Sequence, residues 1–188
     1  MDINLEDSVR FFPNWNPMTG DQVSGLIRMV FDIYLMDPSA SDWVEIGTLS
    51  GESALIISAF PFVKKFRCVD KGFYRRRKML DCRLSRRITE GVVEVFEMTS
   101  AEYEATLPEG ERVDVVYIDG DHSRDGAKLD IMAWWPRVRP GGFLCGHDFH
   151  PNHPGVVESV SEFLMAEGLE MRTYEDFSWL VRRPIAAG

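Results

Sequence analysis

Apolar segments that can form strands alternate with segments of helical periodicity along most of the chain. The strand candidates are residues 42–46, 66–70, 92–97, 113–118 and 142–147, and the helical segments between them lie near 51–60, 73–88, 100–106 and 123–135. Repeated strand–helix units of this kind favour a parallel sheet joined by right-handed crossovers. In such a sheet, ligands bind in the loops at the carboxyl ends of the strands, near the point where the strand order reverses.

The two ends of the chain depart from this alternation. A helix is predicted from Thr19, which suits a helix N-cap, to a point before Pro38, and residues 1–18 lack periodicity. Near the C-terminus, one more helix is followed by strand candidates at 169–174 and 178–182, with a very short connection between them. That connection is too short for a crossover, so the last two strands are expected to form an antiparallel hairpin.

Length and composition favour one globular domain. The chain has 188 residues, of which 45% are hydrophobic and 27% charged, a balance that excludes an intrinsically disordered chain. No apolar stretch reaches the length of a membrane span, and the N-terminus lacks the features of a secretory signal. We therefore expect a single cytoplasmic domain over residues 1–188 that does not enter a membrane. The widely spaced Cys68, Cys82 and Cys145 predict reduced thiols.

The first predicted strand runs into a glycine-containing loop with the pattern Glu45-x-Gly47-x-x-x-Gly51. Its glycines permit a tight turn and a close approach of a ligand to the backbone, and the helix that follows presents unpaired N–H groups. Leu49 occupies the place of the second glycine of a dinucleotide fingerprint, and the loop lacks the ending of a P-loop. The pattern indicates a nucleotide-type cofactor; the alternative is a glycine turn that only packs the strand against the helix.

Asp70 ends the second predicted strand. A carboxylate at the tip of the strand beside a glycine loop can accept hydrogen bonds from both hydroxyls of an unmodified ribose. A lone aspartate in this place can equally cap the next helix. Considered together with the glycine loop, Asp70 favours a cofactor that contains ribose.

Four short motifs lie at the ends of the later strands and helices. They are I-D-G-D-H-S at 118–123, W-W-P at 134–136, P-G-G at 140–142 and G-H-D at 146–148. Together with the glycine loop and Asp70, they make residues 44–149 resemble the class I S-adenosylmethionine-dependent methyltransferases, and in particular their small O-methyltransferase-like members. The resemblance implies a three-layer, Rossmann-like α/β fold with a seven-stranded, mostly parallel sheet in the order 3-2-1-4-5-7-6 that ends in the C-terminal antiparallel hairpin.

The same resemblance implies a methyltransferase with S-adenosyl-L-methionine as cofactor. The methionine end of the cofactor is then expected against the loop from Glu45 to Gly51, the ribose on Asp70, and the adenine beside residues 98–100. The residues that the resemblance assigns to the cofactor are Glu45, Gly47, Thr48, Gly51, Ser53, Asp70, Ser100 and Asp119. Ser100 is equally suited to capping the helix that follows it.

A hydroxyl that accepts a methyl group needs a base, a metal ion or both, because its own pKa is high. Asp119 ends the fourth predicted strand and His147 and Asp148 end the fifth, so three potential metal ligands meet at the rim of adjacent strands. In the divalent-metal O-methyltransferases that the chain resembles, these positions carry an aspartate and then two oxygen ligands, and the residue three places after the first aspartate is the base. Here that residue is His122, whose imidazole titrates near neutrality, and Asp119 is predicted to act beside it.

His147 departs from that family pattern, since a carboxylate usually stands in its place. A nitrogen ligand fits magnesium poorly and a first-row transition metal better, so either the metal differs or none is bound. Without a metal, Asp119 would contact the cofactor or the acceptor, His147 would be hydrogen-bonded at the strand end, and Asp148 would orient a loop.

The loop after this strand contains weaker candidates. Asp121 is expected to form a turn rather than to bind a ligand. A zinc site made of His147, His150 and His153 is disfavoured, because Pro151 prevents a helical array of the three imidazoles.

Positive charge is concentrated in one segment of an acidic chain. The net charge is −9, yet residues 64–87 contain 11 of the 21 lysines and arginines. Such a segment can attract RNA, a phosphorylated substrate or an acidic partner, and it can also be a solvated helix face.

The preferred interpretation is O-methylation of a small hydroxylated molecule, with His122 as general base. The sequence leaves open whether a divalent metal ion assists. The alternatives are methylation of RNA or protein through the basic residues 71–87, a non-catalytic S-adenosylmethionine-binding module, and a nicotinamide-dependent dehydrogenase, which Leu49 disfavours.

Residues 1–40 are expected to be an N-terminal extension and helix that can cover the substrate. Phe11, Phe12 and Trp15 would then form either an aromatic wall of the acceptor pocket or a local core. The acceptor pocket itself is either open or completed by a second copy of the chain in a homo-oligomer.

Overall fold

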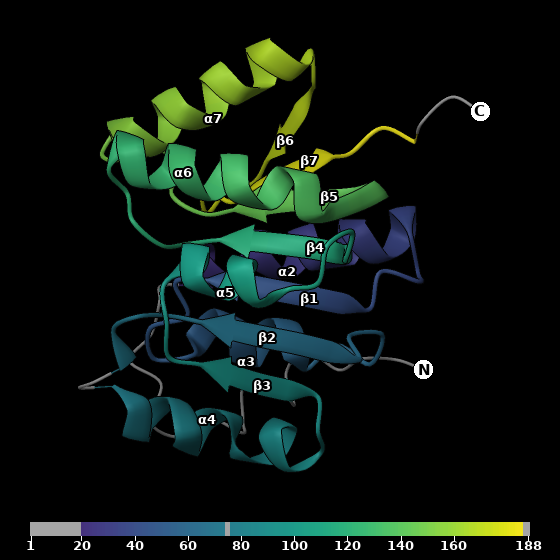
Figure 1. The fold of residues 1–188 in the computed structure, drawn as a ribbon, viewed down its shortest axis with the longest axis vertical. Helices are drawn as coiled ribbons and strands as arrows, with labels where there is room; N and C mark the ends of the chain where they lie inside the picture. Colours follow the sequence, from purple (N-terminus) through teal and green to yellow (C-terminus); the bar gives the residue numbers. More distant parts are fainter. Residues whose placement is uncertain (1–19, 74–75, 186–188) are drawn as a thin grey trace.

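The structure is a computed structural model that describes residues 20–73 and 76–185, and these residues build one seven-stranded sheet. The strands are β1 (Asp42–Ile46), β2 (Lys65–Val69), β3 (Val93–Phe96), β4 (Val113–Ile118), β5 (Val138–Gly146), β6 (Met171–Thr173) and β7 (Trp179–Arg182). Their order, β3-β2-β1-β4-β5-β7-β6, is the predicted one (Figure 1). Neighbours from β3 to β5 pair in parallel, and β7 pairs antiparallel with β5 and β6, which confirms the C-terminal hairpin.

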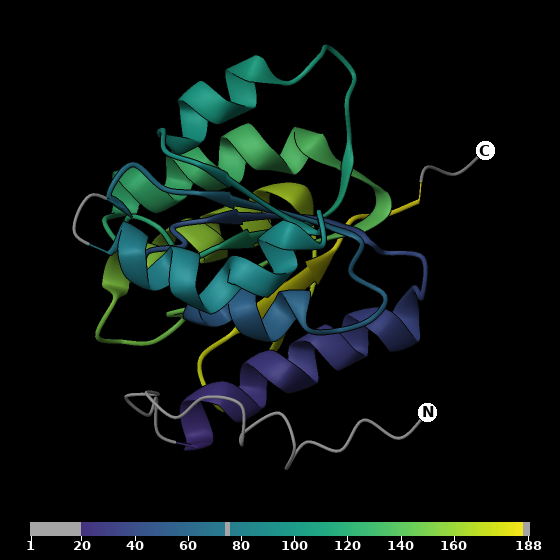
Figure 2. The same cartoon turned by 90° about the horizontal axis from the view of Figure 1, so that it is seen from below.

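Helices connect the parallel strands and cover both faces of the sheet. They are α2 (Gly20–Met36), α3 (Glu52–Ser58), α4 (Arg77–Thr89), α5 (Ser100–Thr106), α6 (Arg124–Trp134) and α7 (Pro154–Glu167), with a short 3-10 turn η2 (Trp135–Arg137) after α6. One buried cluster contains apolar residues of α2, α3 and α4, and a second contains those of α5, α6 and α7. The result is a three-layer α/β fold, in which Figure 2 shows α2 and α5 on opposite sides of the sheet.

The strand and helix bounds follow the prediction with two differences. β5 begins at Val138, earlier than the predicted residue 142, because Val113 pairs with Val138 across an irregularity in the β4–β5 register and Gly141 adopts φ +79°. A left-handed glycine and a local register shift let a strand continue through residues that normally end one. α4 begins at Arg77 rather than at 73, since the buried Phe73 belongs to the turn that precedes the helix.

Helix caps agree with the sequence in one case and differ in another. The side chain of Ser123 accepts a hydrogen bond from Gly126 N at 3.1 Å, so this serine caps α6, as a serine at the start of the predicted helical segment 123–135 is expected to do. Thr99, and not Ser100, caps α5, through a capping box with Glu102. Ser100 is therefore the first residue of that helix, and its hydroxyl is available for other contacts. The predicted cap Thr19 and the aromatic residues near the N-terminus lie outside the described residues.

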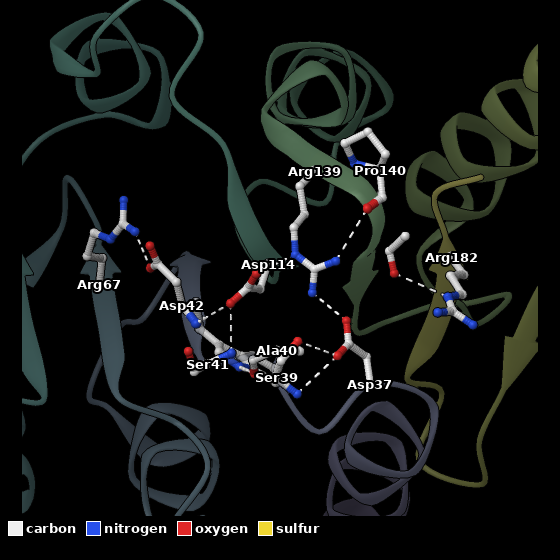
Figure 3. A network of polar contacts seen from close by, with 12 residues as sticks. Asp37, Ser39, Ala40, Ser41, Asp42, Arg67, Asp114, Arg139, Pro140 and Arg182 are labelled. Carbon is white, nitrogen blue, oxygen red and sulfur yellow. Dashed lines mark hydrogen bonds and ion pairs between the residues drawn. The ribbon is translucent and has the colours of Figure 1, made fainter. Parts of the chain in front are cut away.

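An ion-pair network joins the amino ends of the central strands, opposite the edge where a ligand is expected (Figure 3). Asp114 accepts hydrogen bonds from Ser41 N at 2.7 Å and from Asp42 N at 2.8 Å, and Arg139 donates to it at 2.5 Å. Arg139 also binds Asp37, which follows α2. Hydrogen bonds between charged and backbone groups are stronger than neutral ones, so this network fixes the starts of β1, β4 and β5 relative to α2.

Much of the predicted basic segment is paired within the fold. Arg67 is buried and binds Asp42, Arg83 lies 2.7 Å from Glu52, and Arg87 lies 2.7 Å from Glu90. These contacts neutralise part of the charge that the sequence places on one face. Lys71 and Arg76, in contrast, line the cavity described below.

Two further predictions concern the state of the cysteines and the lack of a membrane span. Cys68, Cys82 and Cys145 are free cysteines, as predicted, and only Cys82 is exposed. None of the helices in residues 20–73 and 76–185 has both the length and the apolar character needed to cross a bilayer.

Candidate active site

A cavity of about 860 Å³ opens at the carboxyl edge of the sheet. The loops after β1, β2, β3 and β4 line it, together with His147 after β5. β1 and β4 are neighbours at the centre of the sheet, where the chain order reverses, so the cavity lies at the switch point expected for a ligand of such a fold. Its size is in the range of pockets that hold a small molecule or a cofactor.

Gly47 is needed for the packing of the loop after β1. Its φ is +91°, and a Cβ placed on it would lie 2.1 Å from the carbonyl oxygen of Asp119. Gly47 N donates to Val69 O at 2.9 Å, and Asp119 N donates to Ile46 O at 2.8 Å, so the ends of three strands meet here. Gly47 therefore has the packing role that the sequence left open as an alternative. Its role in binding a ligand stays a prediction.

A Gly47→Ala substitution should lower the free energy of unfolding by about 2 to 5 kcal/mol, because left-handed strain and overpacking add together. Gly110 is the matched control, since its φ is +80° and nothing lies within 4 Å of a Cβ placed there. Gly110→Ala should cost only the strain, about 1 to 2 kcal/mol. Urea unfolding of both variants measures the difference, and equal losses would contradict the packing role.

Glu45 lies buried beneath the same loop. Its Oε1 accepts a hydrogen bond from Ser53 Oγ, and its Oε2 has no hydrogen-bond partner among the described residues. Burial raises the pKa of Glu45 to about 7, against the opposing effect of the hydrogen bond from Ser53. A carboxyl group with this pKa exchanges a proton near neutrality.

The raised pKa of Glu45 predicts a pH-dependent stability. The fold favours the protonated carboxyl, so this stabilisation is present below the unfolded pKa of 4.5 and is lost as the pH rises through about 7. Between about pH 4.5 and pH 8 the wild type should lose about 3 kcal/mol relative to Glu45→Gln, which has no proton to lose. Unfolding of the apo proteins in urea across this range tests it; parallel curves for the two proteins would contradict the assignment.

Asp70 connects the loops after β1 and β2. Its Oδ2 accepts a hydrogen bond from Leu49 N at 2.8 Å, and its Oδ1 accepts one from Gly72 N at 2.5 Å. It does not cap α4, whose N-cap is Arg76, so the capping alternative is wrong. Each carboxylate oxygen can accept more than one hydrogen bond, so Asp70 can still bind a ligand that enters the cavity it lines.

Asp130 also lines the cavity, and the sequence reasoning missed it. It lies on α6 beside Ser100, whose Oγ accepts a hydrogen bond from Trp134 Nε1 at 2.8 Å. Burial raises the pKa of Asp130, and a hydrogen bond with Ser100 opposes the rise. One signal in the sequence could have revealed it. Asp130 directly precedes the apolar Ile131, so it lies at the edge of the apolar stripe of an amphipathic helix, where an acid is unusual.

Three imidazoles surround the carboxylate of Asp148 at the rim. His122 Nε2 lies 2.8 Å from Asp148 Oδ2, His147 Nδ1 lies 3.1 Å from Oδ1, and His153 Nε2 lies 3.5 Å from Oδ1. Asp119 Oδ1 is 3.8 Å from His122 Nε2. Asp148 has φ +60°, a left-handed conformation that aspartate tolerates better than most residues. That turn in the backbone lets one side chain meet imidazoles from three segments of the chain.

The charges of this cluster shift its pKa values together. The carboxylate of Asp119, and then that of Asp148, raise the pKa of His122 against the effect of partial burial. Burial alone would lower the pKa of His147, but the hydrogen bond with Asp148 and the negative charges of Asp119, Asp148 and Asp176 together outweigh burial and raise it. Burial would raise the pKa of Asp148, but the hydrogen bond with His147 and the charges of the nearby imidazoles together hold it below its ordinary value. Burial raises the pKa of Asp119.

Two overlapping groups of side chains in the cluster could hold a metal ion. Ligand atoms of Asp119, His147 and Asp148 lie within 4.8 Å of one another, and so do those of His122, Asp148 and His153. The first group is the predicted one. His147 Nε2 is buried and has no hydrogen-bond partner among the described residues, which leaves one nitrogen free for a ligand.

Asp121 and His150 belong to neither group of potential metal ligands. Asp121 accepts a hydrogen bond from Ser123 N at 2.9 Å and so forms the expected turn. His150 lies against Phe177, with ring centroids 4.1 Å apart, and does not belong to either metal group. The disfavoured site of His147, His150 and His153 does not form among the described residues.

The fold is similar to the folds of three solved O-methyltransferase structures. The chain is similar to an O-methyltransferase from Bacillus cereus in complex with SAH, with 14% identity over 94% of this chain and 86% of that chain and a TM-score of 0.66. It is similar to the O-methyltransferase TomG from Streptomyces achromogenes in complex with SAM, with 15% identity over 96% of both chains and a TM-score of 0.60. It is also similar to CalS11, a TDP-rhamnose 3′-O-methyltransferase in calicheamicin biosynthesis, with 16% identity over 97% of this chain and 87% of that chain and a TM-score of 0.67.

No curated protein matches the sequence. The family described as a methyltransferase domain matches residues 44–149, which is more than half of the chain and includes the loops that line the cavity. The chain therefore belongs to this family, and it is an S-adenosylmethionine-dependent methyltransferase of the class I fold.

Proposed function

We propose that the chain transfers the methyl group of S-adenosylmethionine to a hydroxyl group of a small molecule, with His122 as the general base. The contact of 2.8 Å between His122 Nε2 and Asp148 Oδ2 at the rim of the cavity carries the proposal. A carboxylate that accepts the Nε2 proton favours the tautomer whose Nδ1 has a lone pair. That lone pair can take the proton of a hydroxyl as the oxygen attacks the methyl group.

The donor would occupy the cavity along the loops after β1, β2 and β3. When bound, S-adenosylmethionine supplies a methyl group on a positively charged sulfur. Asp70 would bind the ribose, and residues beneath and within the first loop would bind the methionine end, the two glycines through their backbone; these residues are Glu45, Gly47, Thr48, Gly51 and Ser53. Ser100 would lie at the adenine end. Asp119 would stand between donor and base, since it lines the cavity 3.8 Å from His122.

A small acceptor agrees with the similar structures, all three of which are named as O-methyltransferases and one of which acts on TDP-rhamnose. We further propose that residues 1–188 form one domain and that residues 1–40 help to cover the part of the cavity where the acceptor binds. Leu26 of α2 lines the cavity, which supports that placement.

A divalent ion is a second way to activate the hydroxyl. Asp119, His147 and Asp148 would hold it, and the free Nε2 of the buried His147 supports this fit. The mixed nitrogen and oxygen donors suit a first-row transition metal better than magnesium. Such an ion would lower the pKa of the hydroxyl.

Transfer of a labelled methyl group tests the proposal. The purified protein is incubated with methyl-labelled S-adenosylmethionine and matched small molecules that carry a hydroxyl, an amine or a thiol, before and after exhaustive chelation. Label should pass to hydroxylated acceptors alone, and transfer only to amines or thiols would contradict the proposal. Turnover that survives chelation assigns activation to His122 and Asp148, whereas a loss that Mn²⁺ restores better than Mg²⁺ assigns a role to the ion.

A further inference from the structure

Two imidazoles and one carboxylate meet at the outer edge of the active site. His122 lies between β4 and α6, Asp148 follows β5, and His153 is the N-cap residue of α7. One possible ligand atom of each lies within 4.8 Å of those of the other two. We call these three residues the rim site. His122 is its only member that lines the cavity, so the rim site lies beside the cavity rather than within it.

The backbone holds His153 in place next to His122. His153 N donates to His150 O at 2.8 Å, and His153 O accepts a hydrogen bond from Val156 N at 3.0 Å. Gly155 packs directly against the segment of His122, since a Cβ placed on Gly155 would lie 2.6 Å from His122 O. The two imidazole rings therefore lie side by side, with centroids 4.7 Å apart. Ligands on a fixed backbone need little rearrangement to bind an ion.

The rim site is open to solvent and has the donors of a zinc site. The side chains of His122 and His153 are 42% and 35% exposed. Although His153 is an N-cap residue, its imidazole makes no capping hydrogen bond, so the helix does not use its nitrogens. Two imidazoles with one carboxylate are a common ligand set of zinc sites that leave the fourth position to water, whereas Mg²⁺ prefers oxygen ligands. The carboxylate of Asp119, 3.8 Å from His122 Nε2, adds further attraction for a cation.

We propose that Zn²⁺ binds to His122, Asp148 and His153 and inhibits methyl transfer by occupying Nε2 of His122. Nε2 is the nitrogen that faces Asp148, at 2.8 Å. A metal ion on Nε2 uses the lone pair of that nitrogen, so the single proton of the neutral imidazole stands on Nδ1. Nδ1 can then no longer take the proton of a hydroxyl. The inhibition rests on the proposed function, because it needs His122 as the base, whereas the binding of zinc does not.

Calorimetric titration of the chelator-treated protein with Zn²⁺, without donor or acceptor, tests the site. Loss of a residue that only supports a metal ligand costs about 10- to 100-fold in affinity, so His153→Gln, which removes a ligand, should cost about 100-fold or more. His147→Gln should cost at most about 10-fold, because His147 supports Asp148 and belongs to the other group of ligands. His150→Gln is the matched control and should stay within about twofold of the wild type.

Inhibition of labelled methyl transfer gives a second measurement. Zn²⁺ should inhibit the wild type over the concentrations that fill the site, and inhibition of His153→Gln should need about 100-fold more Zn²⁺, in line with its weaker binding. If His153→Gln does not fold, His122→Gln removes a ligand from another segment and should weaken zinc binding to a similar extent.

The outcomes separate the rim site from the proposed function. A folded wild type that binds no Zn²⁺, or a larger loss of affinity in His147→Gln than in His153→Gln, would overturn the rim site. Zinc binding that leaves methyl transfer unchanged would overturn the inhibition. An absence of methyl transfer in the zinc-free protein would contradict the proposed function instead, and the calorimetric data would still decide whether the rim site binds zinc.

Discussion

Replacing His122 with glutamine should lower kcat about 10²- to 10⁴-fold, the usual contribution of a general base. Glutamine keeps a polar side chain of similar reach but cannot take a proton at neutral pH. Affinity for S-adenosylmethionine should change little, because His122 acts on the acceptor side. Single-turnover transfer of labelled methyl at saturating donor measures the effect, with the hydroxylated acceptor from the screen above.

The pH profile adds a second test of the same residue. The carboxylates of Asp119 and Asp148 raise the pKa of His122 above its ordinary value of roughly 6.5, and only the neutral imidazole acts as a base. The value of kcat/KM should therefore rise with pH and level off above this raised pKa. Asp148→Asn should shift the midpoint to lower pH and reduce the plateau, because it removes both a negative charge and the group that orients the imidazole.

His150→Gln is the matched control for His122. His150 lies in the neighbouring loop but packs on Phe177 and belongs to neither metal group. Its replacement should leave kcat within about twofold of the wild type, since it makes no contact with the proposed base. Undiminished turnover of His122→Gln, or an equal loss in both variants, would remove His122 from the mechanism.

Replacing Asp70 with alanine should weaken the binding of S-adenosylmethionine about 10²-fold or more, because two hydrogen bonds to a carboxylate are lost. The variant also loses the contacts of Asp70 with Leu49 N and Gly72 N, so the loop is less well ordered. Calorimetric titration measures the affinity, and thermal unfolding without ligand reports the structural part.

Asp70→Asn separates the two contributions, since it keeps the size of the side chain and one acceptor oxygen. It should fall between the wild type and Asp70→Ala in affinity. An Asp70→Ala protein that binds the donor as tightly as the wild type would show that the ribose lies elsewhere.

Elements whose signals are local in the sequence were predicted well. The alternation of apolar and helical segments predicts the parallel strands joined by helices, and the short connection before Trp179 predicts the antiparallel hairpin. The order of the seven strands came from the resemblance to the methyltransferases. The cap of α6 at Ser123 follows from residue type and position. The early start of β5 was not predicted, because P-G-G normally breaks a strand and the register shift that tolerates it depends on the neighbouring β4.

Contacts that depend on tertiary packing were harder to predict. Asp148 meets His122 where Gly155 lets the start of α7 approach residues 122–124, since a Cβ on Gly155 would lie 2.6 Å from His122 O. Asp130 lies within a helix, away from the loops in which ligand residues are expected. Sequence reasoning finds residues at strand ends readily, but it does not find a helical residue that reaches the same cavity.

The central claim is that this cavity binds an adenosyl donor, and calorimetric titration of the wild type with S-adenosylmethionine and S-adenosylhomocysteine tests it most directly. We expect saturable binding of one ligand per chain, weakened by Asp70→Ala. A folded wild-type protein that gives no binding signal with either ligand would contradict the account.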